Sequence, residues 1–195
     1  MTVSLFTFAR VRWLCAALAC MVLAACATPP RTPGTASGTS FDRSGRFALS
    51  VSYSDGRQEA VQGGFSWHDT GAMLMLDLAN PLGNTLARVQ VEPGSATLIR
   101  SDGSTEQAQH PDALVEQVLG SPIPVAGLRD WLRGDTGSDT LQDLQTNPQG
   151  KPTSFTQNGW RVQLSRYDAM GPALLQLNRN DANRTISMRL VVDGG

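Results

Sequence analysis

The sequence predicts a mostly β domain of the α+β class, built on a largely antiparallel sheet with two short helices. Apolar and polar residues alternate over most of the chain after residue 41, which is the period of strands with one buried face. Turn signals of the Asp-Gly and Asn-Gly type separate the alternating segments. Residues 111–133 show helical spacing instead. Strands, then a helical insert, then strands favour an antiparallel sheet, because short turns can join neighbouring strands.

The strands expected before the insert are marked by apolar residues at every second position. Each ends at a turn signal: Asp55-Gly56, Asp69 to Gly71, Glu92-Pro93-Gly94 and Asp102-Gly103. The apolar positions of these strands, which we expect to share one face, are Phe47, Leu49, Val51, Tyr53, Val61, Phe65, Trp67, Leu74, Leu76, Leu78, Val89 and Val91.

Two short helices are expected in the middle of the chain. The first covers Pro111–Leu119, with Asp112 in its first turn, where a negative charge suits the helix dipole, and Gly120 at its end. Ser121–Pro124 is a rigid linker, and Val125–Arg133 is the second helix. Asp135 to Thr140 is expected to be a loop.

The last third of the sequence returns to the pattern of strands. Residues 153–156 and 160–164 flank Asn158-Gly159, the strongest hairpin signal in the chain. Residues 173–177 and 186–192 complete the set, and no internal repeat is evident. These segments supply further apolar faces for the same sheet.

The first 26 residues have the zones of an export signal. Two arginines precede the apolar run Trp13–Leu23, which is too short to span a bilayer. The run ends in Leu23-Ala24-Ala25-Cys26, which resembles the bacterial lipobox, in which the cysteine is acylated. We therefore expect a lipoprotein signal peptide over residues 1–25 and lipidation of Cys26. The alternative is an ordinary signal peptide with a chance cysteine.

The mature chain is expected to be one tethered domain. Residues 26–43, rich in Pro, Thr, Gly and Ser, predict a flexible tether, and residues 44–195 predict a single domain. The other two cysteines leave with the signal, so no disulfide or thiolate metal site is expected. The signal holds two arginines and no acid, which leaves 14 basic and 17 acidic residues and a net charge of −3. This balance does not favour nucleic-acid binding or polybasic membrane binding.

The sequence shows no catalytic or metal-binding constellation. His68 and His110 have no further ligands at metal-binding spacing. Ser66 lies in a Gly-Phe-Ser-Trp-His segment that lacks the final glycine of a nucleophile elbow. No phosphate-binding glycine loop occurs. The sequence therefore predicts neither an enzyme nor a cofactor.

Two apolar features allow a functional interpretation beside a purely structural one. Met73 and Met75 alternate with Leu74, Leu76 and Leu78, so both faces of one expected strand are apolar. Either the sheet packs directly on the helices, or a curved sheet and a helical lid enclose an apolar pocket. The turn Asn80-Pro81-Leu82-Gly83 carries a leucine, which is not a turn residue. Either Leu82 folds back onto the core, or it is exposed to a membrane or a partner.

Several of these segments together resemble the LolB family of outer-membrane lipoprotein receptors. They are Leu76–Asn84, Gly120–Pro124, Leu128–Gly134, Gly45–Ala48 and Asn158–Val162. The resemblance runs from about residue 45 to residue 192. The Asn-Pro-Leu-Gly turn and the later Pro-x-Pro linker, in this order, carry most of its specificity.

The resemblance implies an incomplete antiparallel β-barrel that encloses an apolar cavity and is capped by short helices. It implies an outer-membrane lipoprotein, facing the periplasm, that takes lipoproteins from the soluble periplasmic carrier LolA and inserts them into the outer membrane. Ala27 agrees, because Asp after the cysteine is the usual inner-membrane retention signal. The implied partners are LolA, lipoprotein acyl chains and outer-membrane lipid, with no nucleic acid, and the protein is expected to be a monomer. Thr35 to Ser44 is expected to be a loop, where family members often carry an amphipathic helix.

The resemblance and the apolar pattern also define the expected site residues. Leu82, between Pro81 and Gly83, is the implied functional residue of a membrane-insertion turn. The residues expected to line the acyl-chain cavity, from both strands and helices, are Phe47, Leu49, Val51, Phe65, Trp67, Leu74, Leu76, Leu78, Leu114, Val118, Leu128, Trp131, Ile186, Met188 and Leu190.

Two other classes of function stay open. A lipid-anchored hydrolase would need a nucleophile, a base and a polar cleft. A lipid-anchored structural or assembly lipoprotein without transfer activity would need only a filled core. An apolar pocket under a helical lid would favour the transfer factor.

Overall fold

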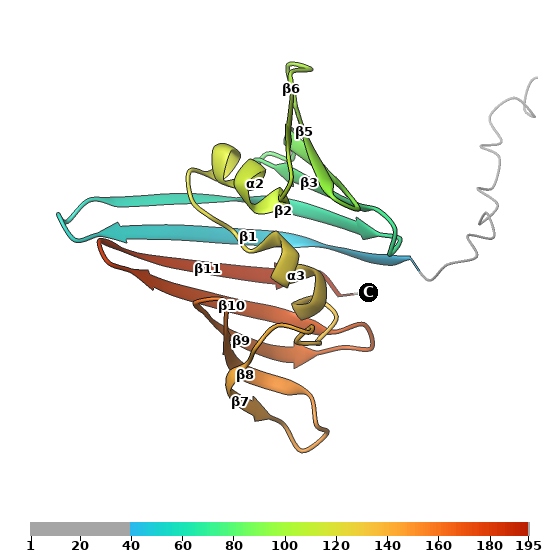
Figure 1. The fold of residues 1–195 in the computed structure, drawn as a ribbon, viewed down its shortest axis with the longest axis vertical. Coiled ribbons are helices and arrows are strands. Elements are labelled where there is room, and N and C mark those ends of the chain that lie inside the picture. Colours follow the sequence, from blue (N-terminus) through green and yellow to red (C-terminus); the bar gives the residue numbers. More distant parts are fainter. Residues whose placement is uncertain (1–39, 195) are drawn as a thin grey trace, which may run out of the picture. The chain divides into compact units, whose positions relative to one another are not determined.

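The computed structural model describes residues 40–194, which form eleven strands and two helices (Figure 1). The expected signal peptide, Cys26 and tether residues 26–39 lie outside the described residues. The elements are β1 Phe41–Tyr53, β2 Gln58–Asp69, β3 Leu74–Ala79, β4 Thr85–Glu92, β5 Ser95–Arg100, β6 Thr105–Ala108, α2 Pro111–Leu119, α3 Val125–Trp131, β7 Gln142–Thr146, β8 Pro152–Gln157, β9 Trp160–Tyr167, β10 Pro172–Asp181 and β11 Arg184–Val192.

All eleven strands belong to one antiparallel sheet in the order β6-β5-β4-β3-β2-β1-β11-β10-β9-β8-β7. The first six strands follow one another outward from the centre, and the last five return inward until β11 pairs with β1. The sheet is not closed, because β6 and β7 are its two free edges. Helices α2 and α3 connect these two edges and lie over one face of the sheet (Figure 1). The prediction of an open, antiparallel, mostly β fold with two short helices is confirmed.

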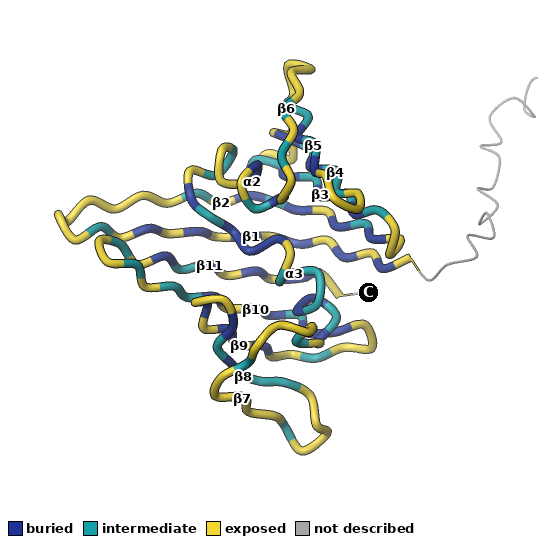
Figure 2. Tube along the Cα trace, viewed as in Figure 1, coloured by how far each residue is buried: buried dark blue, intermediate teal, exposed yellow. Residues whose placement is uncertain are grey.

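The alternation of apolar and polar residues sets which face is buried. Along β1, residues at odd positions are buried and those at even positions are exposed, from Phe41 to Ser52 (Figure 2). The register aligns Leu49 with Val61 on one side and Met188 on the other, so neighbouring apolar residues point to the same face. We call the face that packs against the helices the inner face and the opposite one the outer face.

Helix α2 begins and ends where the sequence signals predict, and α3 begins at its predicted residue. Helix α2 has Pro111 at its start, where a missing N–H costs nothing, and Asp112 in its first turn. It ends at Gly120, whose left-handed backbone (φ 71°) lets its N–H donate to the carbonyl of Glu116. Helix α3 ends at Trp131, two residues before the predicted end. Within residues 40–194, no helix has the length and apolar character needed to span a membrane.

The structure differs from the sequence-based expectations at the start of β1 and at the two sheet edges. Strand β1 begins at Phe41, so residues 41–43 belong to the sheet and not to the tether, and the expected loop over Thr35–Ser44 is wrong for its last four residues. The two edge strands, β6 and β7, were not expected. Every residue of β7 is exposed, so this strand has no apolar alternation to reveal it.

Candidate functional site

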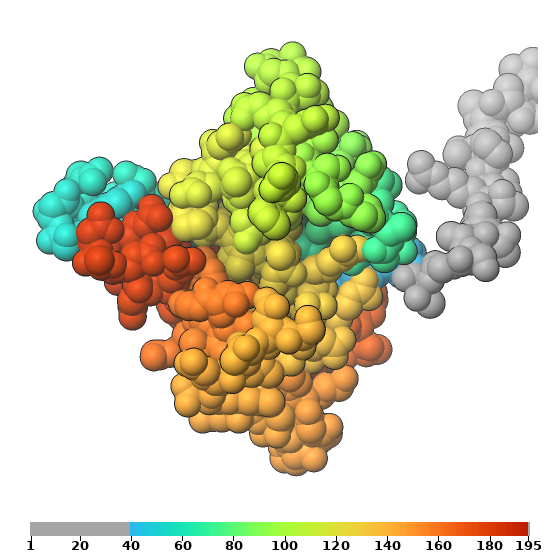
Figure 3. Space-filling view, in the orientation of Figure 1, coloured from blue at the N-terminus to red at the C-terminus, as the bar shows by residue number. Residues whose placement is uncertain are grey.

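The residues expected to line a cavity lie together on the inner face and on the helices that cover it. Fourteen of the fifteen are buried and belong to one apolar core, and Val118 is partly buried against that core. Figure 3 shows the helical segment and its flanking loops, in yellow and amber, filling the space in front of the sheet. A hollow of about 150 Å³ remains between β1, β2 and the end of α2. It is lined by Leu49, Val51, Ala60, Val61 and Leu119, with Glu59 as its one charged residue.

Trp131 fixes α3 to the C-terminal half of the sheet. Its ring is 1% exposed and packs edge-on against Phe155 of β8, with 5.9 Å between the ring centroids. Its indole Nε1 donates a hydrogen bond of 2.8 Å to Gln157 Oε1. The Gln157 amide nitrogen in turn donates to the carbonyls of Thr136 and Asp139, in the loop after α3. One tryptophan therefore joins the helix, the loop and the sheet.

A buried carboxylate fixes the same helix to the N-terminal half of the sheet. Asp69, at the end of β2, is 1% exposed and accepts hydrogen bonds from Arg129 at 2.8 and 2.7 Å and from Arg133 at 3.0 Å. The Gly71 N–H also donates to it, at 2.8 Å. The Arg133 guanidinium lies over the Phe41 ring, 4.1 Å from the ring centroid. We call Asp69, Arg129 and Arg133 the α3 clamp.

The hydrogen bonds within the α3 clamp keep the Asp69 carboxyl ionised. Burial by itself raises the pKa of this carboxyl, but the hydrogen bonds from Arg129, the Gly71 N–H and Arg133 outweigh it and lower the pKa from 3.8 to about 2. Two carboxyls of the insert shift the other way: burial raises the pKa of Asp112 and of Asp130. At neutral pH the α3 clamp is therefore a fully charged contact between the helix and the sheet.

We expect the stabilising effect of Asp69 to disappear in acid. Because its pKa is lower in the folded state than in the unfolded chain, its contribution is fully present above about pH 4 and is lost as the pH falls through 2. The shift corresponds to about 2 kcal/mol. Urea unfolding of the wild type and of Asp69→Asn, measured between neutral pH and pH 2, should show a stability difference that shrinks by about this amount. A difference that stays constant over this range would contradict the assignment.

A second buried charge holds the start of β1. Arg43 is 5% exposed, and its Nη1 donates to both carboxylate oxygens of Asp168 at 2.9 Å. Its Nη2 donates to the carbonyl of Pro172 at 3.0 Å. The hydrogen bonds from Arg43 lower the pKa of Asp168 against the opposing effect of burial. This contact joins β1 to the β9–β10 hairpin, beyond the point where β11 ends.

The Asn80–Asn84 turn presents Leu82 to solvent. Leu82 is 87% exposed, the highest value among the large apolar residues from 40 to 194. The side-chain oxygen of Asn80 accepts hydrogen bonds from the N–H groups of Leu82 and Asn84, at 2.9 and 3.0 Å. Gly83 has a φ of 87°, which a residue with a side chain rarely adopts. The turn is therefore internally bonded, and Leu82 does not fold back onto the core.

The residues considered for catalysis or metal binding do not form a site. Ser66 is exposed on the outer face of β2, and His68 contacts Asp42 across β1 and β2. His110 is the N-cap residue of α2, but its side chain makes no capping hydrogen bond. In the part of the chain that the structure describes, no three His, Cys, Asp or Glu residues are grouped so that they could hold a metal ion. The α3 clamp and the Arg43–Asp168 pair, which sequence reasoning missed, are structural contacts.

Known proteins and family models match this chain over most of its length. The family model described as outer membrane lipoprotein LolB matches residues 39–194. The outer-membrane lipoprotein LolB of Bordetella petrii is 55% identical over 186 residues, which cover 94% of this chain and 92% of that protein. The protein of the same name from Cupriavidus necator is 37% identical over 180 residues, covering 89% and 90%. A solved LolA superfamily protein from Nitrosomonas europaea covers 78% of this chain at 8% identity, with a TM-score of 0.45, too low to establish a shared fold.

Proposed function

The chain belongs to the LolB family of outer-membrane lipoproteins, and we propose that it accepts lipoproteins from the periplasmic carrier LolA and inserts them into the outer membrane. In this proposal the acyl chains of the cargo lie on the inner face of the sheet while the cargo is held. The main support for the proposal is the way the two helices cover the inner face. An apolar surface contributed by most of the strands is closed by only two short helices that connect two free sheet edges.

The physical chemistry of the cargo explains why such a surface is needed. A triacylated lipoprotein carries roughly 45 methylenes, and exposing them to water costs about 0.8 kcal/mol each, on the order of 35 kcal/mol in all. A protein that takes over the cargo must therefore offer a comparable apolar environment. The step from protein to bilayer is downhill, so neither a nucleotide nor a catalytic residue is required.

The helical insert must move for acyl chains to reach the inner face, because its side chains occupy that space in this structure. Two glycines of the insert have left-handed backbones, which glycine adopts at little cost: Gly120 (φ 71°) between α2 and α3, and Gly134 (φ 79°) after α3. The hollow beside Leu119 gives acyl chains a first apolar contact. Opening then requires that the α3 clamp and the Trp131 contacts separate, with acyl chains replacing Leu114, Leu128 and Trp131 against the sheet.

Depletion in the native host tests the proposed function. If this chain receives cargo from LolA, depletion should make outer-membrane lipoproteins accumulate on LolA in the periplasm. A structural lipoprotein without transfer activity would leave LolA unloaded after depletion, and this result would overturn the proposal. Restoring the chain from a plasmid is the control, since it should clear the accumulated cargo.

We expect Cys26→Ala to abolish acylation. Cys26 is the only thiol that the predicted cleavage leaves in the mature chain. Metabolic labelling with a fatty acid should therefore mark the wild type and leave the variant unmarked. The domain should still fold, because the described core begins at Phe41. Fatty-acid label on the variant would contradict this assignment.

A further inference from the structure

The outer face of four neighbouring strands, β1, β11, β10 and β9, carries an excess of positive charge. Arg46 of β1, Arg189 of β11 and Arg161 of β9 point to this face, and none of the three forms an ion pair within residues 40–194. Arg46 and Arg189 are diagonal neighbours, because Arg46 pairs with Val191 and Arg189 pairs with Ala48. Such neighbours lie about 7 Å apart, so both charges contribute to the same local positive potential.

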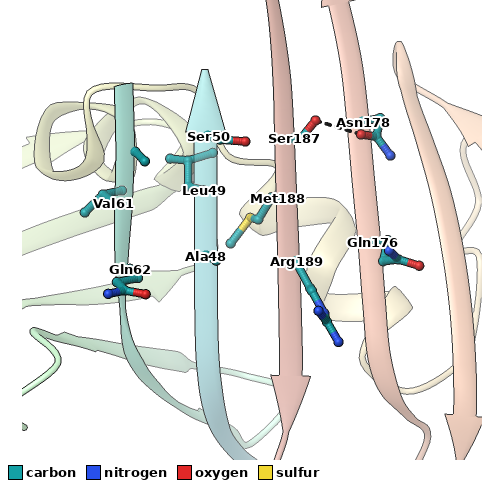
Figure 4. A pocket seen from close by; sticks show the side chains of 11 residues that line it. Ala48, Leu49, Ser50, Val61, Gln62, Gln176, Asn178, Ser187, Met188 and Arg189 are labelled. Atoms are coloured by element: carbon teal, nitrogen blue, oxygen red, sulfur yellow. Dashed lines mark hydrogen bonds between the residues drawn. The ribbon is translucent and has the colours of Figure 1, made fainter. Parts of the chain in front are cut away.

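Acidic residues are nearly absent from this face. The other outward positions of β1, β11, β10 and β9 are mostly Ser, Thr, Asn, Gln and Ala, and the single carboxylate among them, Asp42, contacts His68. Asp193 follows the end of β11 at the margin of the face. Figure 4 shows Ser50, Gln62, Gln176 and Arg189 on neighbouring strands around a shallow hollow of about 470 Å³. Among residues 40–194, no element covers this broad sheet surface, and its net charge is positive.

The helical side of the domain has the opposite charge. Residues 102–143 contain eight carboxylates and two arginines. One of these carboxylates, Glu106, pairs with Arg100, and both arginines are bound to Asp69 in the α3 clamp. The domain therefore has an acidic helical side and a basic outer face. In the field of an anionic surface, such a distribution favours one orientation, with the outer face toward the surface and the helices away from it.

The Leu82 turn lies next to the basic face. A groove of about 440 Å³ is lined by Arg46 and Gln62 together with Asn80, Pro81 and Gly83 of the turn, and its one carboxylate is Asp193. The floor of the groove includes Gly45 and Gly63, where an added Cβ would lie 2.2 and 2.1 Å from a backbone oxygen. An apolar residue on an exposed turn is thus continuous with an arginine-bearing surface, a combination typical of proteins that lie on phospholipid.

We propose that the outer face of β1, β11, β10 and β9 docks on the anionic headgroups of the phospholipid bilayer, with Arg46, Arg161 and Arg189 as its contacts. This orientation places the Leu82 turn at the membrane and directs the helical insert toward the periplasm. The proposal rests on the proposed function only in taking the membrane as the place of delivery. Each arginine near an anionic surface should raise the population of the docked orientation about fivefold, and the three together about 100-fold.

The test measures which face of the membrane-anchored protein lies close to lipid. The mature lipoprotein is reconstituted in vesicles of phosphatidylethanolamine and phosphatidylglycerol that carry a nitroxide quencher at the headgroup. A fluorophore is attached to a single cysteine, either Ser50→Cys on the outer face or Ala113→Cys on the exposed side of α2. We expect strong quenching at position 50, weak quenching at position 113, and loss of this contrast at about 0.5 M salt or in vesicles of phosphatidylcholine alone.

Arginine variants give the matched comparison. Arg46→Gln, Arg161→Gln and Arg189→Gln together should remove the contrast, whereas Arg57→Gln, Arg100→Gln and Lys151→Gln together change the net charge equally and should preserve it. Equal quenching at positions 50 and 113, or an unchanged contrast in the first triple variant, would overturn the proposal. Self-quenching between labels at position 50 would show a second copy on this face instead. If the quenching contrast holds while depletion leaves LolA unloaded, the proposed function fails and the docking surface stands. If the contrast is absent while depletion loads LolA with cargo, only the docking proposal fails.

Discussion

Leu82→Glu should slow the delivery of lipoproteins into liposomes by at least about tenfold while leaving the uptake of cargo from LolA unchanged. Burying a leucine in an apolar environment gains about 1.5–3 kcal/mol, and about 1.4 kcal/mol corresponds to a factor of ten. Leu82 is too small a contact to anchor the protein, but it can lower the barrier for cargo release at the bilayer surface. A glutamate at the same position replaces this gain with the cost of dehydrating a charge.

Two controls separate this effect from general damage. Leu144→Glu introduces the same change at another exposed leucine, on edge strand β7, and should deliver cargo at the wild-type rate. Leu82→Met keeps an apolar side chain and should retain most of the delivery rate. Urea unfolding of Leu82→Glu should match the wild type, because the side chain is 87% exposed. Delivery at the wild-type rate by Leu82→Glu would show that the turn has no part in insertion.

Trp131→Ala should be the most destabilising single substitution considered, with a loss of about 3–5 kcal/mol in the free energy of unfolding. The side chain is 1% exposed, and its removal leaves both a cavity beside Phe155 and a buried Gln157 oxygen without its donor. Because the same contacts hold α3 on the inner face, the variant should also bind a fluorescent fatty acid faster than the wild type does.

Trp131→Phe separates the loss caused by the cavity from the loss caused by the missing hydrogen bond to Gln157. It keeps an aromatic ring against Phe155 and removes only the indole N–H, so the loss should fall to about 1–3 kcal/mol. Denaturant titrations measure both variants, and stopped-flow fluorescence measures probe uptake. If Trp131→Ala is destabilised and yet takes up the probe no faster, α3 does not control access to the inner face.

The elements with strong local signals could be predicted from the sequence. Helix α2 matched its predicted range because Pro111, Asp112 and Gly120 mark its ends in the sequence itself. The long strands were found because their apolar residues alternate. Edge strands β6 and β7 were missed because they bury too little for any alternation to appear. The first residues of β1 were missed because a buried arginine, Arg43, occupies one of the inward positions.

The features that depend on distant residues could not be predicted in this way. Asp69 looks like a turn residue in the sequence, and only the fold brings Arg129 and Arg133, 60 and 64 residues later, to its carboxylate. The exposure of Leu82 was one of two open interpretations until the Asn80 hydrogen bonds were known. The small net charge concealed how charge is distributed, because the basic outer face and the acidic helical side largely cancel in the sum.

Photocrosslinking tests most directly whether the cargo's acyl chains lie on the inner face beneath α2 and α3. A lipoprotein whose acyl chains carry a diazirine is loaded onto LolA, mixed with the mature protein and irradiated, and the crosslinked residues are identified by mass spectrometry. The account predicts crosslinks to inward residues of β1, β2 and β11, such as Leu49, Phe65 and Met188, and to α3 at Leu128. Crosslinks confined to the Leu82 turn and the outer face, with none on these inward residues, would contradict it.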